Sequence, residues 1–409
     1  MRTGGRPADY PADQPPGPRG RRMVGTLYDY EKDPCGYLTA CRDTYGDIFS
    51  LTPHHVVLCR PDWSQSVFAR TNREFRFTTH ETSSRESFMT RQVATWMRAR
   101  RTAGWHRLGR RESGAVMRDR LRDSFAAMAA LPTAGVADCQ RAAADTALHI
   151  FVSDIDDDLR RLVIDSARAV PAITSSSLTL PRWASPSRRR FERATDGLVE
   201  ELSRRARGRH GAGPADDVLG LLSQAEDSFT SVQVAQFLAS AMTNVYAVAG
   251  AALSWLLVMA ARYPDFTDGH MAEAFVKETL RLHPPIWGVG REVAGPAEIG
   301  GYTLPTGTTV LMSVRLTHLD PRWWRDDPSV FRPERWLDPA RPPHDNHAYI
   351  PYGSGSRVCV GAQIAQALLT QAFGVLASSW KVSADPAAPD APPAAVIIPD
   401  PVTFTLTPR

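Results

Sequence analysis

Residues Tyr352–Gly361 read Y-G-S-G-S-R-V-C-V-G and lead directly into A-Q-I-A-Q-A-L-L, which has the composition of a helix. Glycines at 353 and 355 permit backbone conformations that other residues resist, so this loop can hold Cys359 rigidly. A helix that begins just after the sulfur places its positive end nearby, which favours the thiolate over the thiol. A thiolate held in this way suits the role of an axial iron ligand.

The segment resembles the haem-ligand loop of the cytochrome P450 family, F-x-x-G-x-R-x-C-x-G, with Tyr352 in place of the leading phenylalanine. The resemblance implies haem b bound through the Cys359 thiolate, with Tyr352, Gly353, Arg357 and Gly361 in the cofactor-binding loop. It further implies a mainly α-helical fold with a small β lobe, the triangular helical prism of the family.

The rest of the chain agrees with one large globular domain. Residues 1–24 are rich in proline and arginine and predict a disordered leader, followed by a single domain over 25–409. Tyr45–Leu58 predicts two short strands around a turn. Thr230 and Gln233 form a capping box that starts a long buried helix ending near Ala261. The closing stretch V-I-I-P-D-P-V-T-F-T-L predicts a hairpin.

Composition excludes several other classes of protein. A net charge of +4 with dispersed basic residues argues against binding to nucleic acid. The five cysteines form no CxxC pair, and no signal peptide is recognisable, so we expect a cytoplasmic location. The longest apolar stretch, Ala247–Ala261, is short for a membrane span. We expect a soluble monomer, and the preference for arginine over lysine suggests a bacterial source.

Two further groups of charged residues match the family. By resemblance, Glu278 and Arg281 in E-T-L-R pair with Arg335 from F-R-P-E-R-W in a buried structural network. The resemblance also assigns four cations to the haem propionates. They are His106 and Arg110 in W-H-R-L-G-R-R, Arg291, and Arg357.

The long helix departs from the family pattern. Where the family carries A/G-G-x-D/E-T-T, this chain has N-V-Y-A-V-A, so Ala247 and Val248 replace the acid and the alcohol that help deliver protons. Thr243 lies about 140° around an α-helix from position 248 and should face elsewhere. Asn244 lies one turn before Val248 on its face and could present an amide to the ligand.

We expect the substrate pocket to involve Phe88, Met89, Asn244, Trp287 and Val289, with Trp96 and Met97 as further candidates. Their character suggests a small, largely apolar natural-product intermediate in bacterial secondary metabolism. The expected reaction is a monooxygenation such as hydroxylation, epoxidation or oxidative ring formation, with electrons from a separate ferredoxin and ferredoxin reductase.

Two alternatives stay open. The enzyme could bypass dioxygen, using peroxide or activating a substrate N–O or O–O bond, for example by nitrene or oxene transfer or by rearrangement. Alternatively, the protein could be a non-catalytic haem protein that acts as a sensor or binds a ligand.

Overall fold

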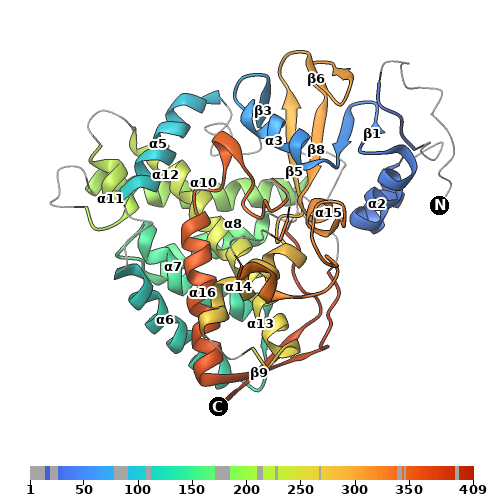
Figure 1. Cartoon of the computed structure of the whole chain (residues 1–409). Coiled ribbons are helices and arrows are strands. Elements are labelled where there is room, and N and C mark those ends of the chain that lie inside the picture. Colours follow the sequence, from blue (N-terminus) through green and yellow to red (C-terminus); the bar gives the residue numbers. More distant parts are fainter. Residues whose placement is uncertain are drawn as a thin grey trace. The chain divides into compact units, whose positions relative to one another are not determined.

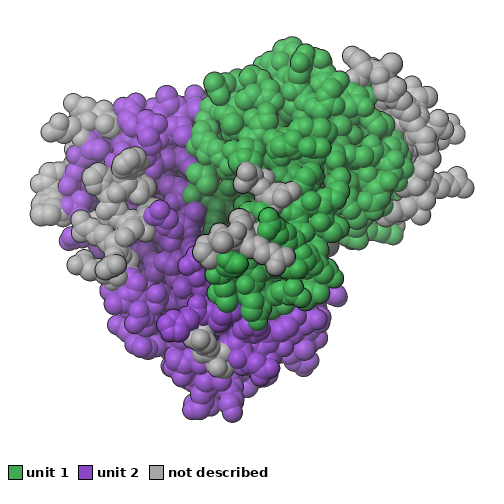
Figure 2. All heavy atoms as spheres, in the orientation of Figure 1, with its two compact units in different colours: residues 1–79, 277–359 green, residues 80–276, 360–409 purple. Residues whose placement is uncertain are grey.

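The computed structural model describes residues 14–18, 26–77, 91–106, 112–170, 185–209, 215–225, 229–266, 269–338, 343–344, 347–391 and 396–409. It is predominantly helical with small sheets (Figure 1), as the sequence predicts. Within it the chain has two compact units, coloured separately in Figure 2. Unit 1 comprises residues 1–79 and 277–359, and unit 2 comprises residues 80–276 and 360–409.

Unit 1 is built on a five-stranded sheet in the order β1-β2-β8-β5-β3. Its strands are β1 (Ile48–Thr52), β2 (His55–Leu58), β8 (Thr309–Ser313), β5 (Gly288–Val293) and β3 (Phe75–Phe77). β2 and β8 are parallel, whereas the other neighbouring strands are antiparallel. The predicted strand pair in Tyr45–Leu58 is therefore confirmed as β1 and β2. A separate antiparallel pair consists of β6 (Ala297–Ile299) and β7 (Tyr302–Leu304).

The helices of unit 1 flank these strands in the chain. They are α1 (Leu27–Lys32), α2 (Pro34–Tyr45), α3 (Pro61–Ala69) and α15 (Val314–Leu319), with 3₁₀ turns at Pro333–Trp336 and Gly355–Arg357. Proline occupies the first position of α2 and of α3, where its missing N–H costs nothing. Apolar side chains of the sheet and of α3 form one buried cluster, which includes Phe68, Phe75 and Val310.

The expectation of a disordered leader is wrong for Gln14–Pro18. Pro15, Gly17 and Pro18 are buried, and the Ser50 amide donates to the Pro16 carbonyl at 2.8 Å. The Ser50 hydroxyl donates to the Pro15 carbonyl, also at 2.8 Å. Because β1 is an edge strand, this proline-rich segment covers backbone groups that would otherwise be unpaired. The remainder of residues 1–24 lies outside the described residues.

Unit 2 holds most of the helices. They are α5 (Val93–His106), α6 (Glu112–Ala129), α7 (Val136–Phe151), α8 (Asp157–Ala169), α10 (Pro186–Gly208), α11 (Val218–Ser223), α12 (Ser231–Asn244), α13 (Gly250–Arg262) and α16 (Ala362–Ser379). A five-residue π-helix, Val245–Ala249, joins α12 to α13. Helix α14 (Ala272–Leu282) contributes residues to both units, after a 3₁₀ turn at Gly269–Met271.

The long helix begins as predicted. The Thr230 hydroxyl accepts from the Gln233 amide at 3.2 Å, and the Gln233 side chain accepts from the Thr230 amide at 2.9 Å. By length and composition alone, residues 231–262 could cross a membrane, but 67% of their most apolar segment is buried inside the protein. The core helix of a globular protein can have the same length and composition.

The predicted C-terminal hairpin is wrong in its pairing. Strand β10 (Thr403–Pro408) pairs antiparallel with β9 (Trp380–Asp385), and Thr403 is opposite Asp385. Prolines 399 and 401 cannot donate to a strand ladder, so residues 396–402 connect the strands instead of forming one. The short strand β4 (Ala134–Gly135) completes a sheet in the order β4-β10-β9.

Candidate functional site

The cysteine loop of unit 1 has a backbone that requires glycine at two positions. Gly353 has φ of +69° and Gly355 has φ of +70°, a region that side chains disfavour. A Cβ at Gly355 would also lie 2.4 Å from the Phe68 carbonyl oxygen, which is too close for any other residue. The two glycines therefore bring the loop against α3 and give it one conformation.

Backbone hydrogen bonds hold the cysteine within this loop. The Gly353 amide donates to the Ile350 carbonyl at 3.0 Å, and the Cys359 amide donates to the Tyr352 carbonyl at 2.9 Å. Cys359 is exposed. Burial and the adjacent Cys359 both raise the pKa of the Tyr352 phenol, so Tyr352 stays neutral beside the sulfur. The loop thus presents a positioned sulfur that a metal can reach.

Two arginines of unit 1 lie on the ring of Phe77. The guanidinium carbons of Arg291 and Arg357 are 4.9 Å and 5.7 Å from its centroid. Arg291 donates to the Thr71 hydroxyl at 3.2 Å and Arg357 donates to the Asn72 side-chain oxygen at 3.0 Å. Both arginines are buried, at 2% and 9% exposure.

This pair of cations suits an anionic ligand. Burial, and next the positive charge of Arg357, lower the pKa of Arg291 to about 10. Among the described residues, no carboxylate forms an ion pair with Arg291. Neighbouring buried charges of one sign are unfavourable unless an opposite charge binds them. The two guanidinium groups and the exposed thiol therefore fit a cofactor that combines carboxylates with a metal, as haem does.

The other residues predicted to bind the cofactor lie in unit 2. Gly361 precedes α16, and its carbonyl accepts from the Ala365 amide at 2.9 Å. His106 is the last residue of α5, and its side chain lies outside the described part of the structure, as does all of Arg110. The roles of these two residues stay predictions.

The three residues of the predicted network meet in unit 1. The Glu278 carboxylate accepts from Arg281 in a bidentate pair at 2.8 and 2.9 Å, and from Arg335 at 3.0 Å. The side chains of Glu278 and Arg281 are 0% exposed, and that of Arg335 is 1% exposed. Breaking such a pair from one side leaves a buried charge without compensation.

Two donors to Glu278 were missed from the sequence. The Trp336 indole N–H donates to it at 2.9 Å, and the Arg332 amide donates at 2.9 Å. Both residues flank Arg335 in F-R-P-E-R-W. A buried carboxylate has several acceptor positions, so donors adjacent to a predicted partner could have been expected.

The π-helix lies where the acid and alcohol of the family are replaced. The Gly250 amide donates to the Val245 carbonyl, five residues back. Ala247 and Val248 are therefore not on α-helical backbone, and the predicted facing of Asn244 and Val248, which assumed α-helical spacing, loses its basis. Asn244 is exposed and Val248 is partly buried. Such π turns inside α-helices are frequent at functional sites.

Thr243 is buried within unit 2, and its facing relative to position 248 stays a prediction. It is 2% exposed, and its hydroxyl donates to the Ser166 hydroxyl of α8 at 3.3 Å. Its side chain therefore packs between α12 and α8 inside unit 2.

The residues predicted to line the pocket have mixed outcomes. Phe88 and Met89 lie outside the described residues. Trp96 packs on Phe237 with centroids 5.1 Å apart and is 5% exposed, so it belongs to the core. Trp287 and Val289 are partly buried and pack against apolar clusters of unit 1.

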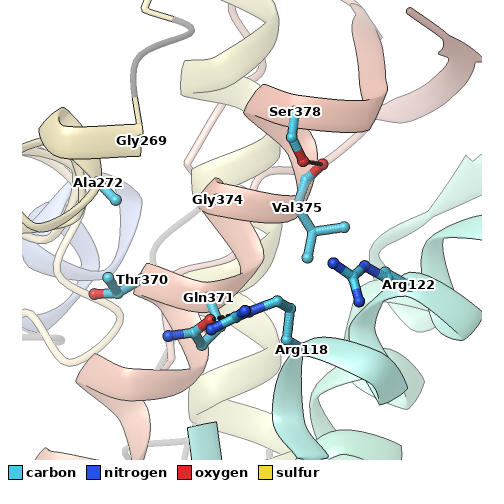
Figure 3. A pocket seen from close by; sticks show the side chains of 9 residues that line it. All are labelled: Arg118, Arg122, Gly269, Ala272, Thr370, Gln371, Gly374, Val375 and Ser378. Carbon is cyan, nitrogen blue, oxygen red and sulfur yellow. Dashed lines mark hydrogen bonds between the residues drawn. The ribbon is translucent and has the colours of Figure 1, made fainter. Parts of the chain in front are cut away.

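A cavity of about 340 Å³ lies within unit 2 (Figure 3). Arg118 and Arg122, one turn apart on α6, face Gln371 and Ser378 of α16 across it. Arg118 Nε donates to the Gln371 side-chain oxygen at 2.9 Å. The residues that line this cavity include no carboxylate. Arg122 pairs with Asp119 at 2.8 Å, so it is the exposed Arg118 that offers a positive charge to an anion at this cavity.

The fold and the cysteine loop together define a haem-thiolate type of protein. The family description "Cytochrome P450" matches residues 256–406. The solved structure of a retinoic acid-bound cyanobacterial CYP120A1 aligns with a TM-score of 0.81 over 97% of this chain and 99% of that one, at 18% identity. A cytochrome P450DA haem domain aligns with a TM-score of 0.77 at 17% identity, over 97% of each chain. The chain thus has the cytochrome P450 fold, and residues 256–406 match the sequence pattern of that family.

Curated relatives align over part of their length. Cyclooctat-9-en-7-ol 5-monooxygenase of Streptomyces melanosporofaciens is 30% identical over 57% of this chain and 58% of its own length. Cytochrome P450 71D18 of Mentha gracilis is 29% identical over 42% of this chain and 40% of its own. The chain thus spans less than two thirds of the relatives it matches.

Proposed function

We propose that this protein is a haem-thiolate monooxygenase that oxidises a small, largely apolar natural-product intermediate in bacterial secondary metabolism. The observation that carries the proposal is the exposed Cys359, held in a loop whose glycines cannot be replaced, in the same unit as two buried arginines. The similarity to a bacterial cyclooctat-9-en-7-ol 5-monooxygenase supports the reaction type and an apolar substrate.

In this proposal Cys359 holds the iron of haem b. Arg291 and Arg357 bind its propionates together with His106 and Arg110, and Glu278, Arg281 and Arg335 support the loop. When bound, haem supplies the redox-active iron at which the substrate is oxidised. The chain's own contribution is the thiolate, the charge pairing of the propionates and an apolar environment for the substrate.

A second candidate is an enzyme that does not use dioxygen. Ala247 and Val248 carry neither an acid nor an alcohol, and they lie on a π-helix. Positioned proton transfer contributes roughly 10² to 10⁴ in rate, which an enzyme that activates dioxygen needs from some source. Peroxide, or a substrate with its own N–O or O–O bond, would make that transfer unnecessary. Asn244, an exposed residue directly before the π-helix, would then orient the substrate through its amide.

For the monooxygenase we propose a separate ferredoxin and ferredoxin reductase as the electron source. The cavity of Figure 3 supports this proposal, because an acidic protein could place a carboxylate against the exposed Arg118, whereas Arg122 already pairs with Asp119. We propose a cytoplasmic monomer that binds neither membrane nor nucleic acid.

Parallel turnover assays test the two candidates. One contains NADPH, ferredoxin, reductase and dioxygen; the second contains peroxide alone; the third is anaerobic with a substrate that carries an N–O bond. Product that requires both reductase and dioxygen supports the monooxygenase, whereas anaerobic product contradicts it. Replacing Cys359→Ser should abolish the thiolate-type absorption of the carbonyl-bound ferrous haem, and an unchanged spectrum would refute the assignment of the ligand.

Charge reversal tests the electron donor. Arg118→Glu should raise the KM for ferredoxin at low salt and leave the peroxide-driven rate unchanged, because charge pairs across an interface steer association. Arg161→Glu is the control, because Arg161 is an exposed arginine of α8 outside the cavity. If both variants behave alike, the cavity is not the docking site.

A further inference from the structure

His318 joins two separate segments of unit 1 through the two nitrogens of its ring. It lies in α15 and is 0% exposed. Its Nδ1 is 3.1 Å from the Arg281 carbonyl oxygen near the end of α14, and its Nε2 is 3.0 Å from the Ile350 amide nitrogen. One neutral side chain thus bridges the helix of the buried ion pair and the segment that leads into the cysteine loop.

The surroundings allow only one tautomer of this ring. The Ile350 amide can only donate, so Nε2 must accept. Nδ1 therefore carries the proton and donates to the Arg281 carbonyl. Burial, followed by the charge of Arg281, lowers the pKa of His318 to about 3, so the ring is neutral at ordinary pH.

Packing also fixes the plane of the ring. His318 stacks on Tyr349 with centroids 5.4 Å apart and planes 25° apart. Trp324 contacts it edge-on at 6.2 Å. A buried ring held by one stacked contact, one edge contact and two hydrogen bonds transmits the position of one hydrogen-bond partner to the other, because close packing leaves it little room to turn.

The Ile350 end of the bridge continues to the sulfur. The Ile350 carbonyl accepts from Gly353, which turns the chain at φ of +69°. The Tyr352 carbonyl then accepts from the Cys359 amide. Displacing Ile350 would therefore displace the turn and, through Tyr352, the cysteine.

We propose that His318 is a positioning residue for Cys359: it fixes the start of the cysteine loop to α14 by donating to Arg281 and accepting from Ile350. The inference rests on the proposed role of Cys359 as the haem ligand. Its consequence is that the orientation of the thiolate depends on an acceptor at the Nε2 position, and not merely on a filled volume in α15.

Three variants of His318 test whether the cysteine loop needs an acceptor at the Nε2 position or only a side chain that fills the volume. In His318→Gln the side-chain oxygen reaches the place of Nε2 and can still accept from Ile350. In His318→Asn the amide nitrogen takes the place of Nδ1 and can donate only toward Arg281. In His318→Leu neither bond is possible. Val310→Ala, in the buried cluster of the sheet, is a control that destabilises the same unit without touching the bridge.

The first readout is hydrogen exchange of the Ile350 and Cys359 amides in the protein without haem. We expect about tenfold faster exchange at both amides in the Asn and Leu variants, and near-native exchange in the Gln variant. The second readout is the fraction of thiolate-type absorption in the carbonyl-bound ferrous haem. It should fall in the Asn and Leu variants and stay near native in the Gln variant and in Val310→Ala.

Native exchange and native spectra in His318→Leu would overturn the proposal, as would equal losses in all three variants and in Val310→Ala. If His318→Leu does not fold, the comparison of Gln with Asn still decides. Absence of any thiolate-type spectrum in the wild type would refute the proposed function, whereas the exchange of the Ile350 amide would still test the bridge.

Discussion

Arg281 and His318 exchange two hydrogen bonds across unit 1. The Arg281 guanidinium donates to the His318 carbonyl at 3.0 Å, and the His318 ring donates to the Arg281 carbonyl at 3.1 Å. Both side chains are 0% exposed. The same guanidinium pairs with Glu278, so the ion pair is held at a fixed position relative to α15 as well as within α14. The network therefore depends on all of its members.

Removing the negative charge of Glu278 at the centre of this network should strongly destabilise the folded protein. Glu278→Gln leaves the guanidinium groups of Arg281 and Arg335 buried without a counter-charge. We expect a loss of about 3–5 kcal/mol in the free energy of unfolding, measured by denaturant titration.

The control for this prediction is Asp119→Asn. Asp119 pairs with Arg122 at 2.8 Å, and the two side chains are 71% and 57% exposed. An exposed pair contributes about 0–1 kcal/mol, so this variant should unfold close to the wild type. Similar losses of unfolding free energy in both variants would contradict the prediction that the buried Glu278 network stabilises the protein more than an exposed ion pair does.

Close packing of two helices gives a second prediction. A Cβ at Gly250 would lie 2.6 Å from the Cα of Gln140, so α13 and α7 approach too closely for any larger residue. Gly250→Ala should destabilise the protein by about 1–3 kcal/mol, because backbone cannot move aside as a flexible side chain would. Thermal or denaturant unfolding measures this loss.

Gly197→Ala provides the matched substitution within a helix. At Gly197 in α10 the nearest atom to a new Cβ is Leu162 Cδ2 at 3.7 Å, an ordinary contact. Alanine is the better helix former by about 1 kcal/mol, so this variant should be more stable than the wild type. A stable Gly250→Ala variant would contradict the close approach of α7 and α13.

Much of this molecule is predictable from sequence because the relevant signals are local. The Thr230–Gln233 capping box and the glycines at 353 and 355 act within a few residues, and the structure has each of them. The π-helix at Val245–Ala249 carries no comparable signal, since its sequence is as apolar as the α-helix around it. Likewise, nothing near Ser50 in the sequence indicates that Pro15 and Pro16 accept its hydrogen bonds.

The role of His318 could not be read from sequence for a related reason. Its two partners, Arg281 and Ile350, lie 37 residues before it and 32 residues after it. A single histidine in an apolar segment predicts only that the ring needs some partner. Tertiary structure supplies the identity of those partners, and with it the tautomer.

A partly buried histidine of unit 2 gives a third prediction, on pH. Burial, and next the charge of Arg120, lower the pKa of His149 in α7 to about 4 from 6.5. Between pH 4 and 6.5 the unfolded chain therefore binds more protons at this position than the folded chain does. Folding stability should fall as pH drops from 6.5 toward 4, by roughly 1–2 kcal/mol from this partly solvent-screened group.

Denaturant titrations at several pH values check this contribution. His149→Gln should flatten the decline between pH 6.5 and 4 relative to the wild type, since glutamine does not titrate. The exposed His270 is the control, and His270→Gln should keep the wild-type decline. If the slopes of His149→Gln and the wild type coincide, His149 does not carry the acid sensitivity.

The strongest test of the chemistry lies on the π-helix. In the double variant Ala247→Asp with Val248→Thr, the acid and alcohol of the family pattern return at their sequence positions. If a missing proton relay limits a monooxygenase, dioxygen-dependent turnover should rise, by up to roughly 10²-fold, while peroxide-driven turnover changes little. The measurement is product formed per reductase-delivered electron pair, compared with peroxide released.

The control Ala247→Val with Val248→Ala preserves the apolar character and should change neither rate. A double variant that loses native product without gaining dioxygen-dependent turnover would instead favour chemistry that bypasses dioxygen, because the new carboxylate would then only disturb an apolar substrate environment.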